Sequence, residues 1–133
     1  MKTQVAVVRG EQPSKIVETA LDLIGAKGLI TSRDSVLIKP NYVSAQPPST
    51  GITTDSRIVE SLIEFVKAAG VREITVSEGG AGDTDRAFDV VGIRDVVARQ
   101  KVKLVNLNRD STVSVKPPQA LALHEVKDRK SVV

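Results

Sequence analysis

One group of polar side chains in the sequence could bind an anion. Lys39 follows the apolar run of residues 36–38, and a lysine at the end of a buried strand holds a positive charge on a rigid element. Further polar atoms would come from a nearby amide and three hydroxyl groups, those of Asn41, Ser49, Thr53 and Thr54. A lysine at a strand end can also simply extend into solvent. The neighbouring polar residues are therefore what favours an anion site.

A glycine-rich stretch at residues 78–83 carries the second group of candidate residues. Gly79 and Gly80 would let the backbone approach a ligand closely, although the stretch lacks the GxGxxG spacing of a dinucleotide-binding turn. Hard divalent cations prefer oxygen ligands, and the carboxylates that could supply them are those of Glu78, Asp83 and Asp85. The alternative interpretation is a tight turn followed by acidic residues that cap a helix.

Catalysis would be an additional step at the same place. Lys39 would stabilise negative charge, and Glu78 would act as a general base or a metal ligand. His124 is the only histidine and lies far along the chain, and no nucleophile-elbow pattern for Ser-His-Asp chemistry is present. The chain has no cysteine, so it cannot itself ligate a cysteine-bound iron–sulfur cluster. Whether the protein is an enzyme, and which cofactor it uses, stays open.

Alternating strands and helices must position these residues. Apolar runs predict four strands, at residues 5–8, 36–38, 74–76 and 104–105. Helical spacing predicts three helices between them, one from Ser14 with Gly28 at its end, one over 55–69 with Gly70 at its end, and one over 84–100 interrupted at Gly92. We expect Ser14 to be the N-cap of the first helix and Gly28 its left-handed C-terminal residue. Thr54 or Asp55 would cap the second helix.

The order of these elements predicts the fold class. Strands that are apolar on both faces and alternate with helices form parallel sheets. We therefore predict an α/β fold, a three-layer α/β/α sandwich with a mainly parallel, Rossmann-like sheet. Ligands bind such sheets at the carboxyl ends of the strands. The polar stretches that follow the four strands should then share one edge, namely residues 9–11, 39–42, 77–83 and 106–110.

The length and the C-terminal pattern bear on domain organisation. A chain of 133 residues suits one domain, and we assign residues 1–133 to a single α/β domain. The pattern weakens towards the end: residues 112–116 alternate as a strand would, residues 121–126 could form another strand, and residues 117–133 form a weakly patterned tail. This last part is either an antiparallel addition or the start of a longer element.

Composition argues against two classes of partner. The formal net charge is +3, but residues 101–133 hold 7 basic and 3 acidic side chains, whereas residues 1–100 hold 12 and 13. Aromatic residues are 2% of the chain, which leaves few surfaces for base stacking. We therefore do not expect nucleic-acid binding. Because no apolar run reaches membrane-spanning length and no signal-peptide pattern is present, we expect a cytoplasmic protein without a membrane partner.

Several segments resemble, in order, domain-of-unknown-function family 362 (DUF362). The likeness begins at residues 36–44 and 50–55, covers roughly residues 1–116, and continues through residues 59–63, 69–71, 74–79, 88–92 and 105–109. Some members of this family are described as iron–sulfur proteins whose ligands lie in a cysteine-rich, ferredoxin-like part, which this sequence lacks. Family members also continue into a further strand and a lysine- and histidine-bearing segment. The resemblance therefore implies a fragment, or a shortened form completed by a second chain.

Two functional hypotheses follow from these observations. In the first, the domain binds a small anionic molecule, with or without a divalent cation, at the carboxyl ends of its parallel strands. In the second, it is a noncatalytic interaction or oligomerisation module that pairs with itself or with an iron–sulfur electron-transfer partner through a sheet edge and the tail. Redox or transfer chemistry is suggested only by the family resemblance.

Overall fold

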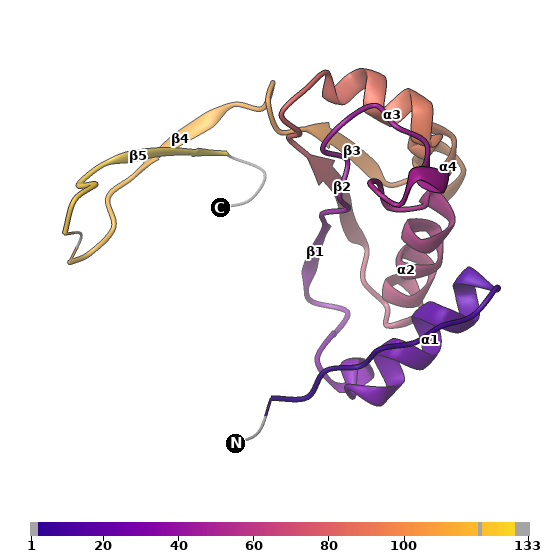
Figure 1. The fold of residues 1–133 in the computed structure, drawn as a ribbon. Helices are drawn as coiled ribbons and strands as arrows, with labels where there is room; N and C mark the ends of the chain where they lie inside the picture. Colours follow the sequence, from indigo (N-terminus) through magenta and orange to yellow (C-terminus); the bar gives the residue numbers. More distant parts are fainter. Residues whose placement is uncertain (1–2, 120, 130–133) are drawn as a thin grey trace.

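A three-stranded parallel sheet packed against helices forms the body of the molecule, and a two-stranded antiparallel arm extends from it (Figure 1). The computed structural model describes residues 3–119 and 121–129. Its elements are, in order, α1 (Pro13–Leu23), η1 (Ala26–Gly28), β1 (Ser35–Ile38), η2 (Pro48–Thr50), α2 (Ser56–Ala68), β2 (Glu73–Glu78), α3 (Thr84–Val91), α4 (Ile93–Gln100), β3 (Lys103–Asn106), β4 (Thr112–Val115) and β5 (Val126–Arg129). The predicted α/β class and parallel sheet are confirmed.

The sheet has the strand order β1-β2-β3. In the parallel register, Ile38 lies opposite Val76, and Glu78 lies opposite Asn106. The carboxyl ends of the three strands therefore meet at one edge. This arrangement brings together the polar stretches that follow β1, β2 and β3.

The hydrophobic core lies between the sheet and the helices. Ile74 and Val76, on one face of β2, share a cluster of buried side chains with the apolar stripe of α2, which consists of Val59, Ile63 and Val66. The same cluster includes buried residues of α3 and α4. Figure 1 shows α2 and α4 on the same side of the sheet. A helical layer on the opposite face, which the three-layer arrangement would require, is not among the described residues.

The ends of the central helices follow the predicted signals. The Asp55 side chain accepts a hydrogen bond from the Arg57 amide and caps α2. Gly70 follows this helix with a φ of +87°, a left-handed conformation that glycine adopts without steric cost. Gly92, with a φ of +71°, separates α3 from α4, so the predicted interruption of the third helical stretch is confirmed.

The N-terminal prediction was wrong in three respects. Residues 5–8 are not paired as a strand, and Val5 and Val7 are 82% and 90% exposed. The helix α1 begins at Pro13 after Gln12, so Ser14 is not its N-cap; proline suits the first helical position because the missing N–H would be unpaired there anyway. The left-handed residue after α1 is Gly25, with a φ of +69°, and Gly28 instead ends the 3₁₀ turn η1.

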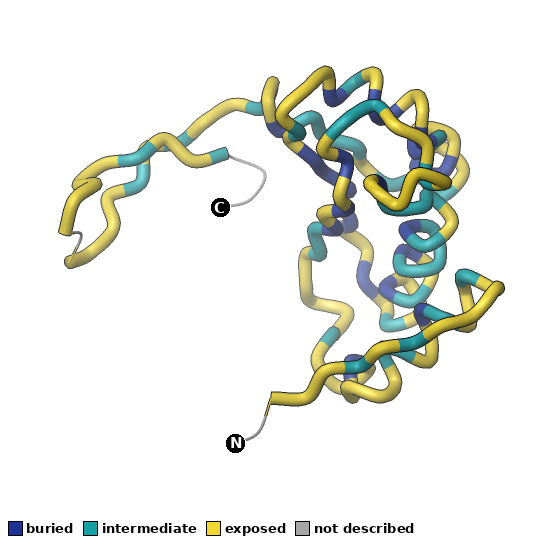
Figure 2. Tube along the Cα trace, in the orientation of Figure 1, coloured by how far each residue is buried: buried dark blue, intermediate teal, exposed yellow. Residues whose placement is uncertain are grey.

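The C-terminal arm is an antiparallel hairpin. Val115 of β4 lies opposite Val126 of β5, so an antiparallel addition is present, but its second strand begins at Val126, where we expected the strand to end. Figure 2 shows that the arm is exposed along most of its length and projects away from the sheet. Residue 120 and residues 130–133 lie outside the described part of the chain.

Candidate functional site

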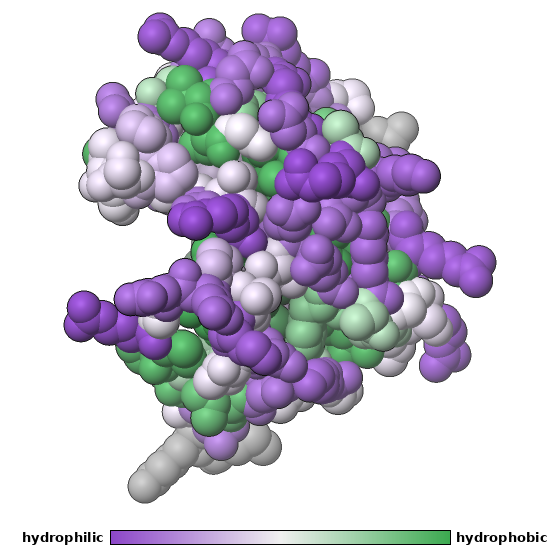
Figure 3. Space-filling view, turned by 90° about the vertical axis from the view of Figure 1, so that its right-hand side faces the viewer, coloured by the Kyte–Doolittle hydropathy of each residue, from purple (hydrophilic) through white to green (hydrophobic). Residues whose placement is uncertain are grey.

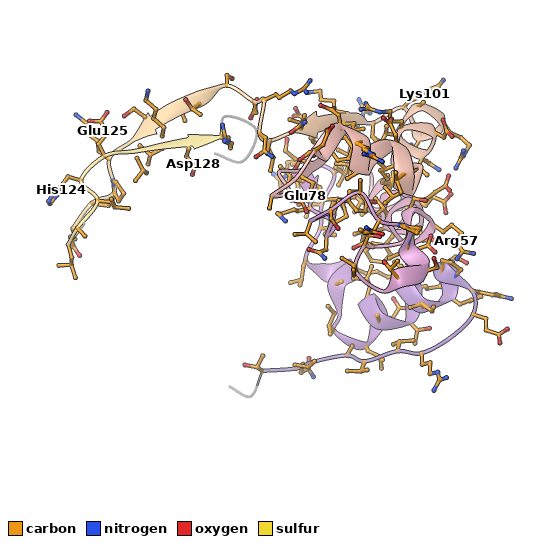
Figure 4. The ribbon with its side chains drawn as sticks, turned by 45° about the horizontal axis from the view of Figure 1, so that its top comes forward. Arg57, Glu78, Lys101, His124, Glu125 and Asp128 are labelled. Carbon is orange, nitrogen blue, oxygen red and sulfur yellow. The ribbon has the colours of Figure 1, made fainter. Side chains whose placement is uncertain are left out.

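The carboxyl ends of β1 and β2 bring Lys39 and Glu78 into direct contact. The Lys39 ammonium group lies 3.0 Å from each of the two Glu78 carboxylate oxygens. The two side chains differ in exposure, because that of Lys39 is 57% exposed and that of Glu78 only 4%. Figure 4 shows Glu78 in the body of the molecule. The sequence prediction that these two residues share one edge is therefore confirmed.

Backbone amides also bind the Glu78 carboxylate. The Tyr42 amide donates to Oε2 at 3.1 Å, and the Gly79 amide donates to Oε1 at 2.7 Å. Burial alone would raise the pKa of Glu78, but the two amides and the Lys39 ammonium group outweigh it and hold the pKa below its usual range. Glu78 is therefore a charged carboxylate that ties the loop after β1 to the end of β2.

This bonding limits the chemistry of Glu78. A carboxylate with a lowered pKa is a weak proton acceptor, whereas a general base works best with a pKa near the operating pH. Lys39 differs, because an ammonium group has three donors and its side chain is more than half exposed. The geometry thus favours a role for Glu78 in positioning the Lys39 side chain. Lys39 is then the group that can bind an anion.

Polar side chains within the loop after β1 hold this loop in shape. The Asn41 amide donates to Thr54 Oγ1 at 3.0 Å, and Asn41 Nδ2 donates to the Ile52 carbonyl at 2.7 Å. Thr53 is buried and donates to the Gln46 carbonyl. Ser49, the remaining predicted ligand-binding residue in this loop, is exposed and lies in η2.

The glycine-rich loop after β2 passes very close to its neighbours. A Cβ atom built on Gly80 would lie 2.6 Å from the Tyr42 carbonyl oxygen, and one on Gly79 would lie 3.1 Å from Asn108 Oδ1. Asn108 Nδ2 also donates to the Gly80 carbonyl at 2.7 Å. These two glycines therefore allow three loops at the strand ends to pack together, and the contacts in the structure are with protein atoms.

The three carboxylates considered as metal ligands have separate partners. Glu78 has the contacts given above, and Asp83 caps α3 by accepting from the Arg86 amide at 3.1 Å. Asp85 accepts from Asn106 Nδ2 at 2.9 Å and forms ion pairs with two arginines, Arg94 and Arg109. Within residues 3–119 and 121–129, no group of three or more His, Cys, Asp or Glu residues could hold a metal ion.

Two residues in the stretches expected at this edge were not selected as candidate site residues from the sequence. Arg109 follows β3, its side chain is 76% exposed, and its Nη1 lies 3.1 Å from Asp85 Oδ2. Tyr42 is fully buried and packs edge-on against Phe88, with ring centroids 6.2 Å apart. Burial raises the pKa of Tyr42, and the Asp55 and Glu78 carboxylates raise it further. Tyr42 is the only tyrosine, and its position directly after Asn41 was the available signal.

Two other predicted polar groups lie elsewhere. Residues 9–11 do not reach the sheet edge, because residues 5–8 are not a strand, and they border a hollow beside the start of α1. His124 lies on the arm, well apart from Glu78 (Figure 4). The shared edge therefore receives three of the four expected stretches.

The molecular surface gives a further view of the helix-bearing side. Figure 3 shows hydrophilic side chains over much of this side, with apolar side chains gathered both near its top and in its lower part. Exposed apolar residues near α1 include Leu23, 60% exposed, and Leu29, 75% exposed. None of the described helices has the length and apolar character needed to cross a membrane.

Comparisons with known proteins place the chain in a family. No curated protein and no solved structure matches it significantly. A family model described as "Domain of unknown function (DUF362)" matches residues 36–131. The match begins within β1 and includes the arm, whereas the resemblance seen in the sequence extended over residues 1–116. Because the match covers more than half of the sequence, the chain belongs to the DUF362 family.

Proposed function

We propose that this protein binds a small anionic ligand at the carboxyl ends of β1, β2 and β3. The observation that carries the proposal is the exposed Lys39 ammonium group, held 3.0 Å from a buried carboxylate. Glu78 restricts the orientations of the lysine side chain and so reduces the entropy that is lost when an anion binds. With three donors and two carboxylate oxygens beside it, the ammonium group of Lys39 has at least one donor left for an oxygen atom of a ligand.

A second cation supports the same site. Arg109 lies after β3 on the same edge of the sheet, and its guanidinium group is largely exposed although it pairs with Asp85. Arginine binds carboxylate and phosphate groups through two parallel hydrogen bonds. A ligand with two anionic groups would therefore bind Lys39 after β1 and Arg109 after β3 at the same time.

Titration with simple anions tests this proposal. We expect inorganic phosphate, pyrophosphate or malonate to raise the melting temperature, since a ligand that binds only the folded state stabilises it. Lys39→Ala should abolish the shift. The matched control is Lys103→Ala, because Lys103 is 69% exposed but lies at the opposite, amino end of β3. The proposal fails if none of the three anions produces a shift, or if both lysine variants weaken binding equally.

A divalent cation at this site can be tested in the same titration. The three candidate carboxylates do not converge in the described structure, so the cation would need oxygen ligands from the anion itself. We expect Mg²⁺ to tighten anion binding through such shared coordination. If Mg²⁺ raises the affinity for the anion and Asp85→Asn removes this increase, Asp85 is a protein ligand of the cation. An anion affinity that Mg²⁺ leaves unchanged would argue against a cation at this site.

A second candidate function is that of an interaction module, and the arm favours it. An isolated two-stranded hairpin is at best marginally stable in water, yet β4 and β5 form most of their contacts with each other. Leu121 and Leu123, between these strands, are 100% and 67% exposed. The family resemblance points to an iron–sulfur electron-transfer protein as the partner. Sedimentation of a mixture with a ferredoxin should show a complex that is lost when residues 111–133 are deleted.

A further inference from the structure

We propose that the outer edge of β1 binds residues 4–8 of a second copy of this chain as an added strand, so that two copies exchange their N-terminal segments. This interaction surface is separate from the anion site and rests on different observations. A failure of anion binding would therefore leave it intact, and the reverse also holds.

The first observation is an open sheet edge. Within the described part of the chain, β1 pairs on one side only, with β2. The outward N–H and C=O groups of an edge strand are a template for pairing with another strand. Natural edges are often protected by lysine, proline or a bulge. The four residues of β1, which are Ser-Val-Leu-Ile, include neither lysine nor proline.

The second observation is a segment with the properties of a strand but without a partner strand. Val5 and Val7 are 82% and 90% exposed, whereas the alternate residues Ala6 and Val8 are partly buried. This two-residue period is typical of an extended segment with one packed face. Valine is favoured in strands because its branched side chain packs on a pleated surface. Pairing would therefore cover apolar surface that is exposed in the single chain.

The position of α1 favours a second copy over the chain's own segment. Four residues, 9–12, connect the segment to Pro13 at the start of α1, and four residues span at most about 14 Å. In Figures 1 and 4 the start of α1 is the end farther from β1. Because α1 packs on α2, any shift of this helix that brought the segment to its own sheet would uncover the buried Val17. A segment from another copy can pair with β1 while α1 stays in place and Val17 stays buried.

The exchange is reciprocal. In the described part of the chain, each copy carries one open β1 edge and one segment without a strand partner. When the same two copies exchange their segments, the interface is symmetric and closes at two copies. The expected assembly is therefore a dimer rather than an open chain of subunits.

Light scattering of the full chain over about a hundredfold range of concentration tests the dimer, because its population depends on concentration. Val7→Pro removes a ladder hydrogen-bond donor at a position that is 90% exposed in the single chain, so its fold should be unchanged by circular dichroism. We expect its dissociation constant to rise at least about tenfold. Thr3→Pro, just outside the pairing segment, is the matched control and should leave the constant unchanged.

Hydrogen exchange identifies the segment that pairs with the outer edge of β1. In the dimer, the amides of residues 4–8 and the outward-facing amides of β1 should be protected together, and Val7→Pro should remove both protections. A monomer at every concentration would overturn the proposal, and so would a dimer that is insensitive to Val7→Pro. Protection of residues 4–8 in a monomer would also overturn it, because the chain's own segment would then occupy the edge.

Discussion

Glu78 is the residue on which the loops at the strand ends depend. It is 3% exposed, and its carboxylate binds one ammonium group and two backbone amides. A charge without such partners would be strongly destabilised at this degree of burial. The contacts thus both stabilise the ionised form and fix the positions of Lys39 and Tyr42.

Replacement of Glu78 gives a prediction that depends on pH. The folded-state pKa lies below its usual range, so the ionised carboxylate contributes stability that is fully present above the unfolded-state pKa. This stability is lost as the pH falls through the folded-state pKa. We expect Glu78→Gln to lower the free energy of unfolding by about 2 kcal/mol near pH 7. The difference from the unmodified protein should shrink as the pH falls below about 4. Urea titrations at several pH values measure it.

The matched control for this prediction is Glu73→Gln. Glu73 also has a lowered pKa, caused chiefly by a hydrogen bond from Ser35 and then by Lys103, but its side chain is 62% exposed. Solvent screens such a pair, so the loss should be much smaller than that of Glu78→Gln. Equal losses for the two glutamine variants would contradict the role assigned to Glu78.

Two glycines in one loop give a second prediction at this scale. A methyl group at Gly80 would collide with backbone atoms of Tyr42 and Val43, whereas one at Gly82 would meet nothing within 4 Å. We expect Gly80→Ala to destabilise the fold by about 1–3 kcal/mol and Gly82→Ala to change it by less than about 0.5 kcal/mol. Thermal denaturation followed by circular dichroism compares them. A neutral Gly80→Ala would show that the loops are free to separate.

At the scale of elements, helix starts illustrate how similar sequence signals have different outcomes. Asp55 accepts the Arg57 amide and begins α2, as its side-chain type predicts. Ser14 is an equally good capping residue but lies inside α1, because Pro13 already occupies the first helical position. The local preference for a cap was therefore overridden by the neighbouring proline.

This contrast predicts different effects of two alanine substitutions. Asp55→Ala should lower the free energy of unfolding by about 1 kcal/mol, because α2 loses its side-chain cap. Ser14→Ala should change it by less than about 0.5 kcal/mol, because no cap is lost. Chemical denaturation measures both variants. Equal losses would indicate that Ser14 contributes a contact beyond its position in α1.

At the scale of the whole molecule, the body and the arm are different kinds of structure. The body has one cluster of buried side chains drawn from the sheet and α2, α3 and α4. The arm consists of two four-residue strands that pair with each other. Because the core that stabilises the body includes no arm residue, the two should differ in stability.

Deletion of residues 111–133 tests this difference. We expect the shortened protein to fold and its melting temperature to change by less than about 2 °C, since the deleted part contributes nothing to the core. In the full chain, the amides of β4 and β5 should exchange faster than those of β2. A large fall in melting temperature would show that the arm supports the body.

Much of the fold could be predicted from sequence because its signals are local. The apolar runs at β1, β2 and β3, the stripe of α2 and the interruption at Gly92 each appear within a few residues. The same local signal failed at residues 5–8, because a strand exists only when a neighbouring strand pairs with it. No local pattern specifies that neighbour.

The candidate site, like the fold, could be predicted only in part from the sequence. Residue types and spacing alone determined that Lys39 and Glu78 follow two parallel strands and so lie at one edge. Only the tertiary structure decided that Glu78 is bound by the Tyr42 and Gly79 amides, that Asp83 and Asp85 have separate partners, and that Arg109 pairs with Asp85. The physical reason is that strand direction follows from the alternation of apolar strands and helices along the chain, whereas hydrogen-bond partners depend on distances between loops that are far apart in the sequence.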